Sequence, residues 1–525
     1  MCYLKNSCLL IIAILFLQGC KKDLLETIPN DRISTEIFWK TDNDATLAAN
    51  AVYTYMAESA DHFMGWDDMS DIVFTNPTGP QEASIQQGQF NGLNSRISGD
   101  WTRLYAGIRA ANSFLDHVDQ IQTTNTALMS RLKGEVRALR AHFYTQLAFL
   151  WGDVPLVTNE ISLEESETVS RTPVAKVWDF ISTELTESAA LLPLKQTEKG
   201  RVTKGAALAL KARAMLYAGR YQEAADAAKQ VMDLNTYSLY PTYKTLFSYP
   251  AENNSEVILD VQYVADTYSN NIFQVLAPRS VNANSKWVPT KKIVDAYQMT
   301  NGKDITDPTS GYDPANPYKN RDPRLKYSVY VPGDSLPNDK VFNSLPNSTT
   351  GDAVGSSFVV SPTGFNVKKY VNKDDLAKPA NCGINIILLR YAEVLLTYAE
   401  AKIELNQIDA SVYDAINKVR QRSDVNMPAI ATGKSQAELR DIVRKERMVE
   451  FAFEGLRFFD IRRWKIAEQV MPGKVYGLTY KDAAGNLQTV EVPGWTQIWD
   501  NKNYLWPIPQ KEIELNSNLT QNPGW

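Results

Sequence analysis

Three glutamates recur at every fourth position toward the C-terminal end of the chain: Glu446, Glu450 and Glu454. On a helix this spacing places their carboxyl groups on one face. Two carboxyl groups that converge in a cleft can serve as the acid and base of a glycosidase. The same stretch carries arginines at positions 447, 457, 462 and 463. Because carboxylates and guanidinium groups at such spacing pair readily, we predict a structural ion-pair network here.

Other residue types that support catalysis or metal binding lack the spacing that their chemistry needs. No two of the three histidines (His62, His117 and His142) have the helix-neighbour spacing of a zinc site. Gly433-Lys434-Ser435 is similar to the end of a phosphate loop, but Pro428 stands where the first glycine belongs. We predict a turn there, before a helix that begins near Ser435. The sequence predicts no cofactor and leaves a structural calcium ion unsupported, because four aspartates lack calcium-loop spacing: Asp304, Asp307, Asp313 and Asp322.

The N-terminus has the pattern of an export signal that ends on a cysteine. Lys5 precedes an apolar run at residues 9–17, and Gln18-Gly19-Cys20 follows. The run is shorter than the roughly 20 residues that span a bilayer, so we predict that residues 1–19 form a cleaved signal peptide. Gly19-Cys20 resembles the lipobox of bacterial lipoproteins, in which the cysteine becomes a lipid-bearing N-terminus. Gln18 departs from that pattern, and the alternative is an ordinary signal peptide with a chance cysteine.

The composition is that of a folded protein held together by packing. Apolar residues make up 44% of the 525 positions and charged residues 22%, with a net charge of −5. This balance argues against a nucleic-acid binder, since no basic stripe stands out. After loss of the signal and lipidation of Cys20, Cys382 is the one remaining cysteine, so no intramolecular disulfide is expected. The many aromatics suggest that some rings serve a binding surface.

Apolar periodicity predicts a mainly helical chain. Single helices are expected over residues 42–58, 101–118, 132–150 and 177–192, and hairpins similar to tetratricopeptide repeats over 203–234 and 388–422. Turn-forming residues dominate elsewhere, which predicts a long loop over 60–99, an irregular lobe of loops and short strands over 240–385, and a further turn-rich stretch with strands over 472–504. A cleft between the helices and the irregular lobe is the expected place for a ligand.

Four sets of short strings extend over almost the whole chain in a fixed order. They include Cys20-Lys21-Lys22-Asp23-Leu24-Leu25 near the start and the ending Gln521-Asn522-Pro523-Gly524-Trp525. The sets are residues 20–25 and 38–45; 101–112, 135–141 and 152–157; 320–324 and 390–401; and 446–464, 504–509 and 521–525. Each string is weak alone, but the ordered set is specific. In it the chain resembles the SusD/RagB family of outer-membrane lipoproteins.

The resemblance implies a mainly α fold, in which a tetratricopeptide-like helical scaffold carries a large irregular lobe. The expected layout is a single domain over residues 20–525, with scaffold at about 30–235 and 386–470, a ligand-facing lobe at about 240–385, the loop region 60–99 and a C-terminal segment 471–525. The resemblance also implies a non-catalytic protein, lipid-anchored on the outward face of the outer membrane. Such proteins bind an oligosaccharide and pass it to a SusC-like TonB-dependent transporter. The alternatives are a peptide or another nutrient as ligand and, more remotely, a surface glycosidase.

The residues that bind the ligand have to be argued from chemistry, because they vary within the family. Sugar rings stack their C–H faces on flat aromatics, while their hydroxyls need polar partners nearby. Aromatics in turn-rich segments beside such partners are therefore the candidates. The candidates are Trp66, Phe90 with Asn94 and Arg96, Tyr268, and Asn284 with Trp287. For each aromatic the alternative is a buried loop anchor. Four further tryptophans lie in scaffold strings and are expected to serve packing: Trp101, Trp151, Trp464 and Trp506.

Overall fold

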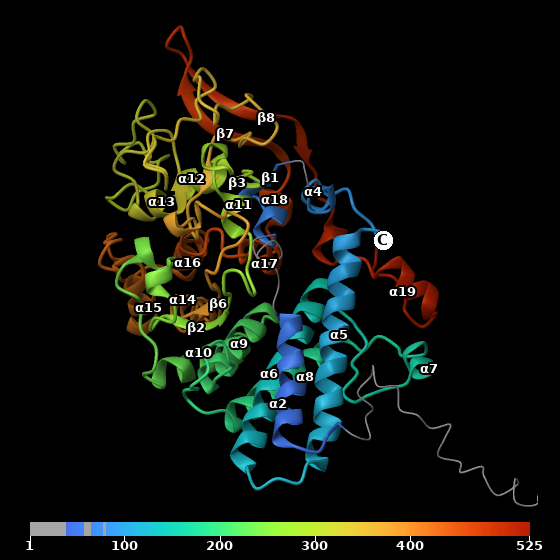
Figure 1. Ribbon diagram of the computed structural model, residues 1–525. Coiled ribbons are helices and arrows are strands. Elements are labelled where there is room, and N and C mark those ends of the chain that lie inside the picture. The colour runs from blue at the N-terminus through green and yellow to red at the C-terminus, as the bar shows by residue number, and fades with distance from the viewer. Residues whose placement is uncertain (1–37, 57–64, 77–79) are drawn as a thin grey trace, which may run out of the picture.

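The computed structural model of the chain describes residues 38–56, 65–76 and 80–525. It is mainly helical, with helices below and a mixed lobe of short helices, strands and loops above (Figure 1). Within the described ranges, no helix combines the length and the apolar character that a membrane crossing demands. The predicted signal peptide, Cys20 and His62 lie outside the described residues.

In the described residues, nine longer helices form the scaffold. They are α2 (Asp42–Met56), α5 (Ser95–His117), α6 (Thr126–Trp151), α8 (Val174–Leu191), α9 (Lys204–Tyr217), α10 (Tyr221–Asp233), α14 (Tyr391–Glu404), α15 (Ala410–Arg420) and α16 (Gln436–Glu450). The helices α5, α6, α8, α9 and α10 pack successively, and α10 then packs on α14. Helices distant in sequence thus continue one scaffold, which confirms the predicted mainly α fold class.

The hairpin of α9 and α10 shows why small residues favour this packing. Alanines fill the buried faces of both helices, which lets the two backbones approach closely. Gly219 adopts φ +70° in the turn between them, a conformation that glycine reaches without strain. The predicted hairpin over 203–234 is therefore confirmed. The later hairpin of α14 and α15 starts at Tyr391, because residues 386–390 form a strand.

As far as the chain is described, the second lobe is built on four two-stranded antiparallel sheets. The pairs are β1 (Val73–Thr75) with β3 (Trp287–Pro289), β2 (Val257–Val261) with β6 (Ile386–Arg390), β4 (Val329–Tyr330) with β5 (Asn366–Val367), and β7 (Gly473–Lys481) with β8 (Leu487–Gln497). Because β2 also packs on α9, this strand joins the lobe to the scaffold. The β7–β8 hairpin projects at the top of Figure 1.

Short helices connect these parts. They are α4 (Pro80–Gln86), α7 (Leu163–Ser166), α11 (Ile272–Leu276), α12 (Lys291–Ala296), α13 (Pro323–Ser328), α17 (Arg457–Arg463), α18 (Ala467–Val470) and α19 (Gln510–Leu515). Single 3-10 turns are η2 (Asp67–Met69), η3 (Val118–Gln120), η4 (Tyr243–Thr245), η5 (Tyr249–Ala251), η6 (Arg279–Val281), η7 (Lys373–Asp375) and η8 (Asn501–Tyr504).

The prediction of a long loop over residues 60–99 is wrong for much of that range. It contains η2, β1 and α4, and α5 already begins at Ser95. The side chain of Asn94 caps α5 by accepting hydrogen bonds from the backbone N–H groups of Arg96 (3.0 Å) and Ile97 (3.3 Å). An asparagine in this position satisfies N–H groups that the helix leaves unpaired. The described residues of this segment, 65–76 and 80–99, are thus a packed part of the body.

The C-terminal residues close the core of the N-terminal helices. The indole N–H of Trp151, at the end of α6, donates to the backbone oxygen of Pro507 (2.9 Å). The side chain of Asn522 donates to the backbone oxygens of Trp151 (2.9 Å) and Trp506 (2.7 Å). The ring of the last residue, Trp525, lies 4.8 Å from that of Phe90. The C-terminal residues are therefore packed against the end of α6 and against Phe90.

Candidate functional site

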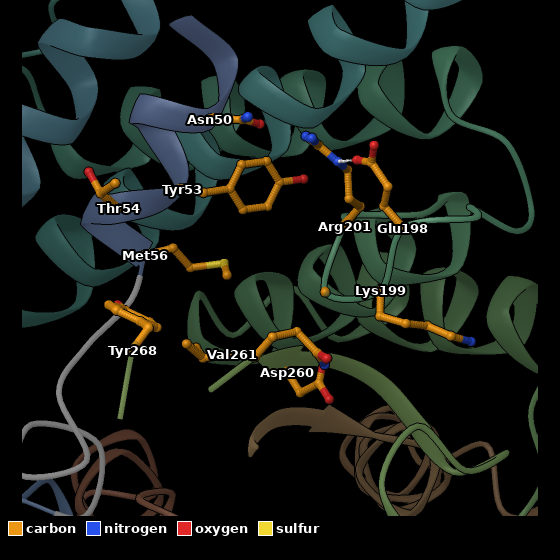
Figure 2. Close-up of a pocket in the computed structure, with 12 residues that line it drawn as sticks. Asn50, Tyr53, Thr54, Met56, Glu198, Lys199, Arg201, Asp260, Val261 and Tyr268 are labelled. Atoms are coloured by element: carbon orange, nitrogen blue, oxygen red, sulfur yellow. Dashed lines mark hydrogen bonds and ion pairs between the residues drawn. The ribbon is translucent and has the colours of Figure 1, made fainter. Parts of the chain in front are cut away.

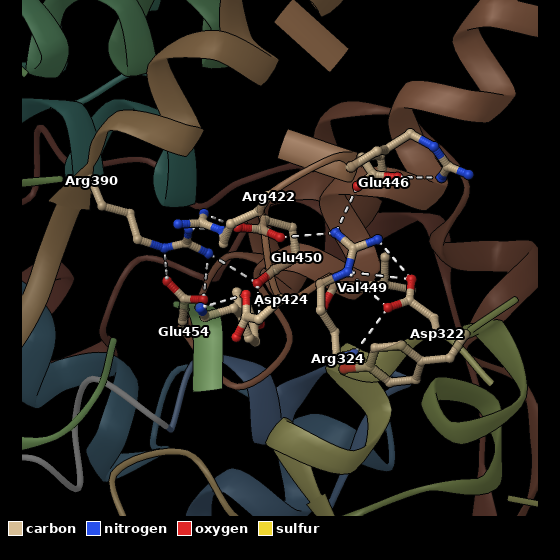
Figure 3. A network of polar contacts seen from close by, with 12 residues as sticks. Asp322, Arg324, Arg390, Arg422, Asp424, Glu446, Val449, Glu450 and Glu454 are labelled. Carbon is tan, nitrogen blue, oxygen red and sulfur yellow. Dashed lines mark hydrogen bonds and ion pairs between the residues drawn. The ribbon is translucent and has the colours of Figure 1, made fainter. Parts of the chain in front are cut away.

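The three glutamates on α16 and its continuation lie in a buried ion-pair network (Figure 3). All six of their carboxylate oxygens accept hydrogen bonds from cationic side chains. Arg324 bridges Glu446 (2.6 Å) and Glu450 (2.8 Å), and Arg390 bridges Glu450 (2.7 Å) and Glu454 (2.6 Å). The predicted structural role of these glutamates is confirmed.

The partners differ from those expected from proximity in sequence. Arg447 bonds Asp460 instead of the three glutamates, and the cations of the network come from distant segments: Arg324, Lys369, Arg390, Arg420 and Arg422. The three arginines around Glu450 hold the pKa of its carboxyl far below the usual range, against the opposing effect of burial. A carboxylate fixed in this way cannot serve as a proton donor.

A pocket of about 330 Å³, here called the central pocket, opens between the scaffold and the second lobe (Figure 2). Helix α2 contributes Asn50, Tyr53, Thr54 and Met56 to one wall. The loop at residues 198–201 and the end of strand β2 form the others, and Tyr268 lies at the rim. The pocket thus lies where a scaffold helix faces a strand of the lobe, the expected position for a ligand site.

Tyr268 presents a flat, half-exposed ring to this pocket. Its ring stacks on that of Tyr263 at 5.2 Å with only 6° between the planes, and 51% of the residue is exposed, whereas Tyr263 is buried. The backbones of Val264 and Tyr268 exchange two hydrogen bonds of 2.9 Å, which fix the turn between the two tyrosines. One face of the Tyr268 ring is therefore supported and the other is open to a partner.

Polar groups from α2 and the 198–201 loop are already ordered around the pocket. The hydroxyl of Tyr53 donates to Glu135 (3.0 Å) and accepts from the backbone N–H of Val202 (2.9 Å). Burial beside Glu135 raises the pKa of Tyr53 well above its ordinary value. Arg201 bonds Glu135 (3.0 Å) and Glu198 and lies over the Tyr53 ring. These contacts hold Tyr53 and Arg201 in place without a ligand.

Asp260, on β2, is the second acidic residue of the pocket. It is 4% exposed, and burial raises its pKa to about 6. Glu198, the other acid, is ion-paired with Arg201. The pocket therefore combines an aromatic platform with an amide, hydroxyls, a guanidinium group and two carboxyl groups.

Of the loop aromatics predicted from the sequence, Trp66 lies inside the protein. It is 4% exposed, and the rings of Phe458, Phe459 and Trp506 lie within 5.7 Å of it. Arg96 covers it at 4.8 Å. Trp66 also borders an inner cavity of about 60 Å³ that shares Met56 with the central pocket. With its ring faces covered by protein groups, Trp66 acts as an anchor of its segment and not as an open sugar platform.

The other predicted residues are also engaged by the protein or lie apart from the pocket. Phe90 is half-buried against Trp525, and Asn94 caps α5. Arg96 is buried and paired with Asp100 (2.8 Å) and Glu82 (3.3 Å). Trp287 lies opposite Thr75 in the β1–β3 sheet. Because this strand is in the interior, Trp287 is only 1% exposed. The structure therefore does not bring Trp66, Phe90, Asn94, Arg96 and Trp287 together with Tyr268 in an open site.

Asn284 is exposed, and its backbone N–H donates to Gln274 (2.8 Å). It does not line the central pocket. The scaffold tryptophans Trp101, Trp151, Trp464 and Trp506 are buried, as expected. In the ranges that the structure describes, no three His, Cys, Asp or Glu side chains group as a metal site would require. Cys382 is buried, and burial raises the pKa of its thiol to about 12.

Of the residues predicted from the sequence, Tyr268 lines the central pocket; Tyr53, Arg201 and Asp260 also line it but were not predicted. Tyr53 sits within an alanine-rich helix, where an aromatic ring usually signals core packing. Asp260 lies in an apolar strand, Val257–Val261, in which a single carboxyl group is the one unusual feature. That buried acid was a signal that could have pointed to the site.

Fold and site together define a tetratricopeptide-like scaffold protein with an open aromatic pocket at the junction of scaffold and lobe. Residues 252–525 match the model of the SusD family, and residues 30–216 match a model described as starch-binding, associating with the outer membrane. The first match covers just over half of the chain. The chain therefore belongs to the SusD family, as the sequence resemblance implied.

Similar proteins cover nearly the whole chain. It is 26% identical to SusD-like protein P2 of Formosa agariphila over 98% of both chains. The crystal structure of a SusD-like carbohydrate binding protein from Bacteroides fragilis is 30% identical, with a TM-score of 0.85, covering 92% of this chain and 100% of that one. The starch-binding protein SusD of Bacteroides thetaiotaomicron is 25% identical, over 88% of this chain and 82% of that protein.

Proposed function

We propose that the protein binds an oligosaccharide in the central pocket and delivers it, uncleaved, to a SusC-like TonB-dependent transporter. The observation that carries this proposal is the Tyr268 ring, which is backed by Tyr263, half-exposed, and part of a pocket that both apolar and polar side chains line. An aromatic ring with one open face suits the apolar face of a sugar, and nearby polar groups suit its hydroxyls. The names of the starch-binding and carbohydrate binding relatives support the same ligand class.

The proposed address is the outward face of the outer membrane, through lipid on Cys20. The family description, which includes association with the outer membrane, supports it. Replacing Cys20→Ala is expected to abolish surface display and co-purification with a large β-barrel, as measured by surface labelling of intact cells and by pull-down. Normal display of this variant would contradict the lipid anchor.

The binding test uses the purified mature protein, calorimetric titration with malto- and laminari-oligosaccharides, and a peptide library in parallel. We expect sugar binding that weakens about tenfold or more in Tyr268→Ala, since loss of one stacking contact costs about 1.5 kcal/mol. Tyr476→Ala is the matched control, because Tyr476 is 42% exposed on β7, away from the pocket. Selective peptide binding, or equal effects of the two variants, would contradict the proposal.

A glycosidase remains the second candidate, because Asp260 and Glu198 both line the pocket and the pKa of Asp260 is raised. The pairing of Glu198 with Arg201 argues for a fixed charge instead of a catalytic group. Product analysis by chromatography on the titrated samples separates the two functions. Intact oligosaccharides are expected, whereas shorter products that disappear in Asp260→Asn would establish an enzyme.

A further inference from the structure

Two further pockets follow the central pocket in series along the junction of scaffold and lobe. The seam pocket, of about 340 Å³, is lined by Lys195, Thr203, Asn253 and Asn254 among others, and it shares residues 198–201 and Asp260 with the central pocket. The tyrosine pocket, of about 390 Å³, follows it and shares Tyr237 with the seam pocket. The three pockets therefore form a series, each sharing a wall with the next.

Gly200, which lines both the central pocket and the seam pocket, lies against the side chain of Gln262. Gly200 adopts φ +75°, and a Cβ atom on it would lie 2.7 Å from Cγ of Gln262. The 198–201 loop and the chain after β2 thus touch at this point. A long ligand would cross over this contact, and the seam pocket is a separate subsite and not an extension of one cavity.

The linings of the two outer pockets suit a carbohydrate. Tyr237, Tyr240 and Tyr391 gather around the tyrosine pocket, each half-buried. The hydroxyl of Tyr237 is hydrogen-bonded to Thr203 (3.1 Å), which fixes the ring on the shared wall. The seam pocket presents the amides of Asn253 and Asn254 and the hydroxyls of Thr203 and Ser255. Aromatic rings beside hydrogen-bonding groups are the combination that sugars require.

The charge of the two outer pockets points to an anionic ligand. Lys195, Lys199 and Lys418 are exposed, and none of the three makes an ion pair within the described part of the chain. Two acidic residues line the seam pocket, but neither opposes an anionic ligand strongly. Glu198 is ion-paired with Arg201, and Asp260 is only 4% exposed. Three ammonium groups on one stretch of surface attract a polyanion, on a protein whose net charge is −5.

We propose that the seam and tyrosine pockets form a second glycan subsite, which binds an acidic polysaccharide through its carboxylate or sulfate groups. This inference rests on the proposed glycan-binding function and names the class of glycan. The lysines contact the anionic groups, while the tyrosine rings contact the sugar faces. Binding is therefore expected to fall as salt rises, because exposed charges are screened.

The test titrates the mature protein with polygalacturonate, with a sulfated galactan and with neutral galactan, each at low and high salt. The first two probes distinguish carboxylate from sulfate as the anionic group. We expect at least one acidic probe to bind more tightly than the neutral one, and this preference to disappear at high salt. Equal affinity for all three probes would overturn the inference.

The matched variants are Lys195→Gln, Lys199→Gln and Lys418→Gln combined, and a control that combines Lys319→Gln, Lys326→Gln and Lys340→Gln. The control lysines are also exposed and make no ion pair in the described residues, but they lie in the second lobe. The first variant is expected to lose about tenfold or more in affinity for the acidic probe, because it removes three positive charges that attract anionic groups. Equal losses in both variants would overturn the inference.

The tyrosine pocket is tested separately with Tyr240→Ala. Its expected effect is weaker binding of the acidic probe and unchanged binding of a short neutral oligosaccharide, which depends on Tyr268. If neutral oligosaccharides bind through Tyr268 and no acidic probe binds better, the second subsite fails while the proposed function stands. If no glycan of any kind binds, the proposed function fails, and the inference with it.

Discussion

The buried network around Glu450 and the central pocket use the same kinds of side chain to opposite ends. In the network, arginine, lysine and glutamate meet in the dry interior, and Arg324 and Arg390 are fully buried. In the pocket, Arg201 and Glu198 pair at the surface beside an aromatic ring that is left open. In the network every charged group has a partner within the protein, so the network serves the structure. In the pocket one face of the Tyr268 ring has no such partner among the described residues, so a ligand can contact it.

The network is expected to be the region most sensitive to the loss of one partner. Arg390→Met leaves the carboxylates of Glu256, Glu450 and Glu454 with fewer counter-charges in the interior. Removing one member of a buried ion pair costs about 3–5 kcal/mol. Urea unfolding followed by circular dichroism should show a loss of this size. A loss below about 1 kcal/mol would mean that the network relaxes as easily as a surface pair.

The second-largest difference is expected in the pH dependence of stability, because Glu450 in the network and Asp260 in the pocket respond to pH in opposite directions. The pKa of Glu450 is lowered, so its pairing stabilises the fold above its ordinary pKa, and that stability is lost only in strong acid. The pKa of Asp260 is raised to about 6, so the native state binds the proton more tightly than the unfolded chain. Stability from this group is therefore present at low pH and is lost as the pH rises through about 6.

Asp260→Asn removes this loss, because the amide never ionises. The free energy of unfolding of the variant, relative to the wild type, is expected to rise by about 1–3 kcal/mol between pH 4 and pH 8. Urea titrations at several pH values measure it. A constant difference between the two proteins across this range would show that Asp260 titrates normally and that the pocket does not desolvate it.

Gly200 should show a smaller effect at the boundary of the pockets. Gly200→Ala places a side chain at φ +75° and against Gln262, at a cost of about 1–2 kcal/mol. Gly311→Ala is a matched control for the backbone term, since it has the same φ and no neighbour within 4 Å of an added Cβ atom. Thermal unfolding compares the two variants. Equal losses would mean that the contact with Gln262 contributes nothing.

The smallest effect is expected for an exposed pair. Lys373 and Asp339 approach to 2.8 Å, but both side chains are largely exposed. Lys373→Met should change the free energy of unfolding by no more than about 0.5 kcal/mol, because water competes for both charges. This variant is the control for Arg390→Met under the same conditions. A loss comparable to that of Arg390→Met would contradict the distinction between buried and exposed pairing.

Local pattern was enough to predict some of these features. The four-residue spacing of Glu446, Glu450 and Glu454 predicted one shared helix face, and the small residues around Gly219 predicted a helical hairpin. The partners of the glutamates could not be predicted, because Arg324 and Arg390 reach them from more than 55 residues away in the chain. Such partners are decided by tertiary packing.

Tertiary packing also explains why the sequence could not distinguish an open aromatic residue from a buried one. Trp66 and Tyr268 both lie in turn-rich sequence beside polar residues, so local pattern treats them alike. Trp66 is covered by Phe458, Phe459 and Trp506, which lie hundreds of positions later, whereas Tyr268 is backed by its near neighbour Tyr263. The exposure of the two rings therefore depends on long-range contacts that cannot be deduced from the spacing of residues in the sequence.

The packing of the last residues against the first helices has a consequence for the order of folding. The core around Trp151 is completed by Trp506 and by the side chain of Asn522, which are made more than 350 residues later. A growing chain can therefore form its helical hairpins early but cannot finish this core until synthesis ends. Contacts between such distant segments slow folding, and a chain that ended before Trp506 would leave apolar surface on α6 uncovered and prone to aggregation.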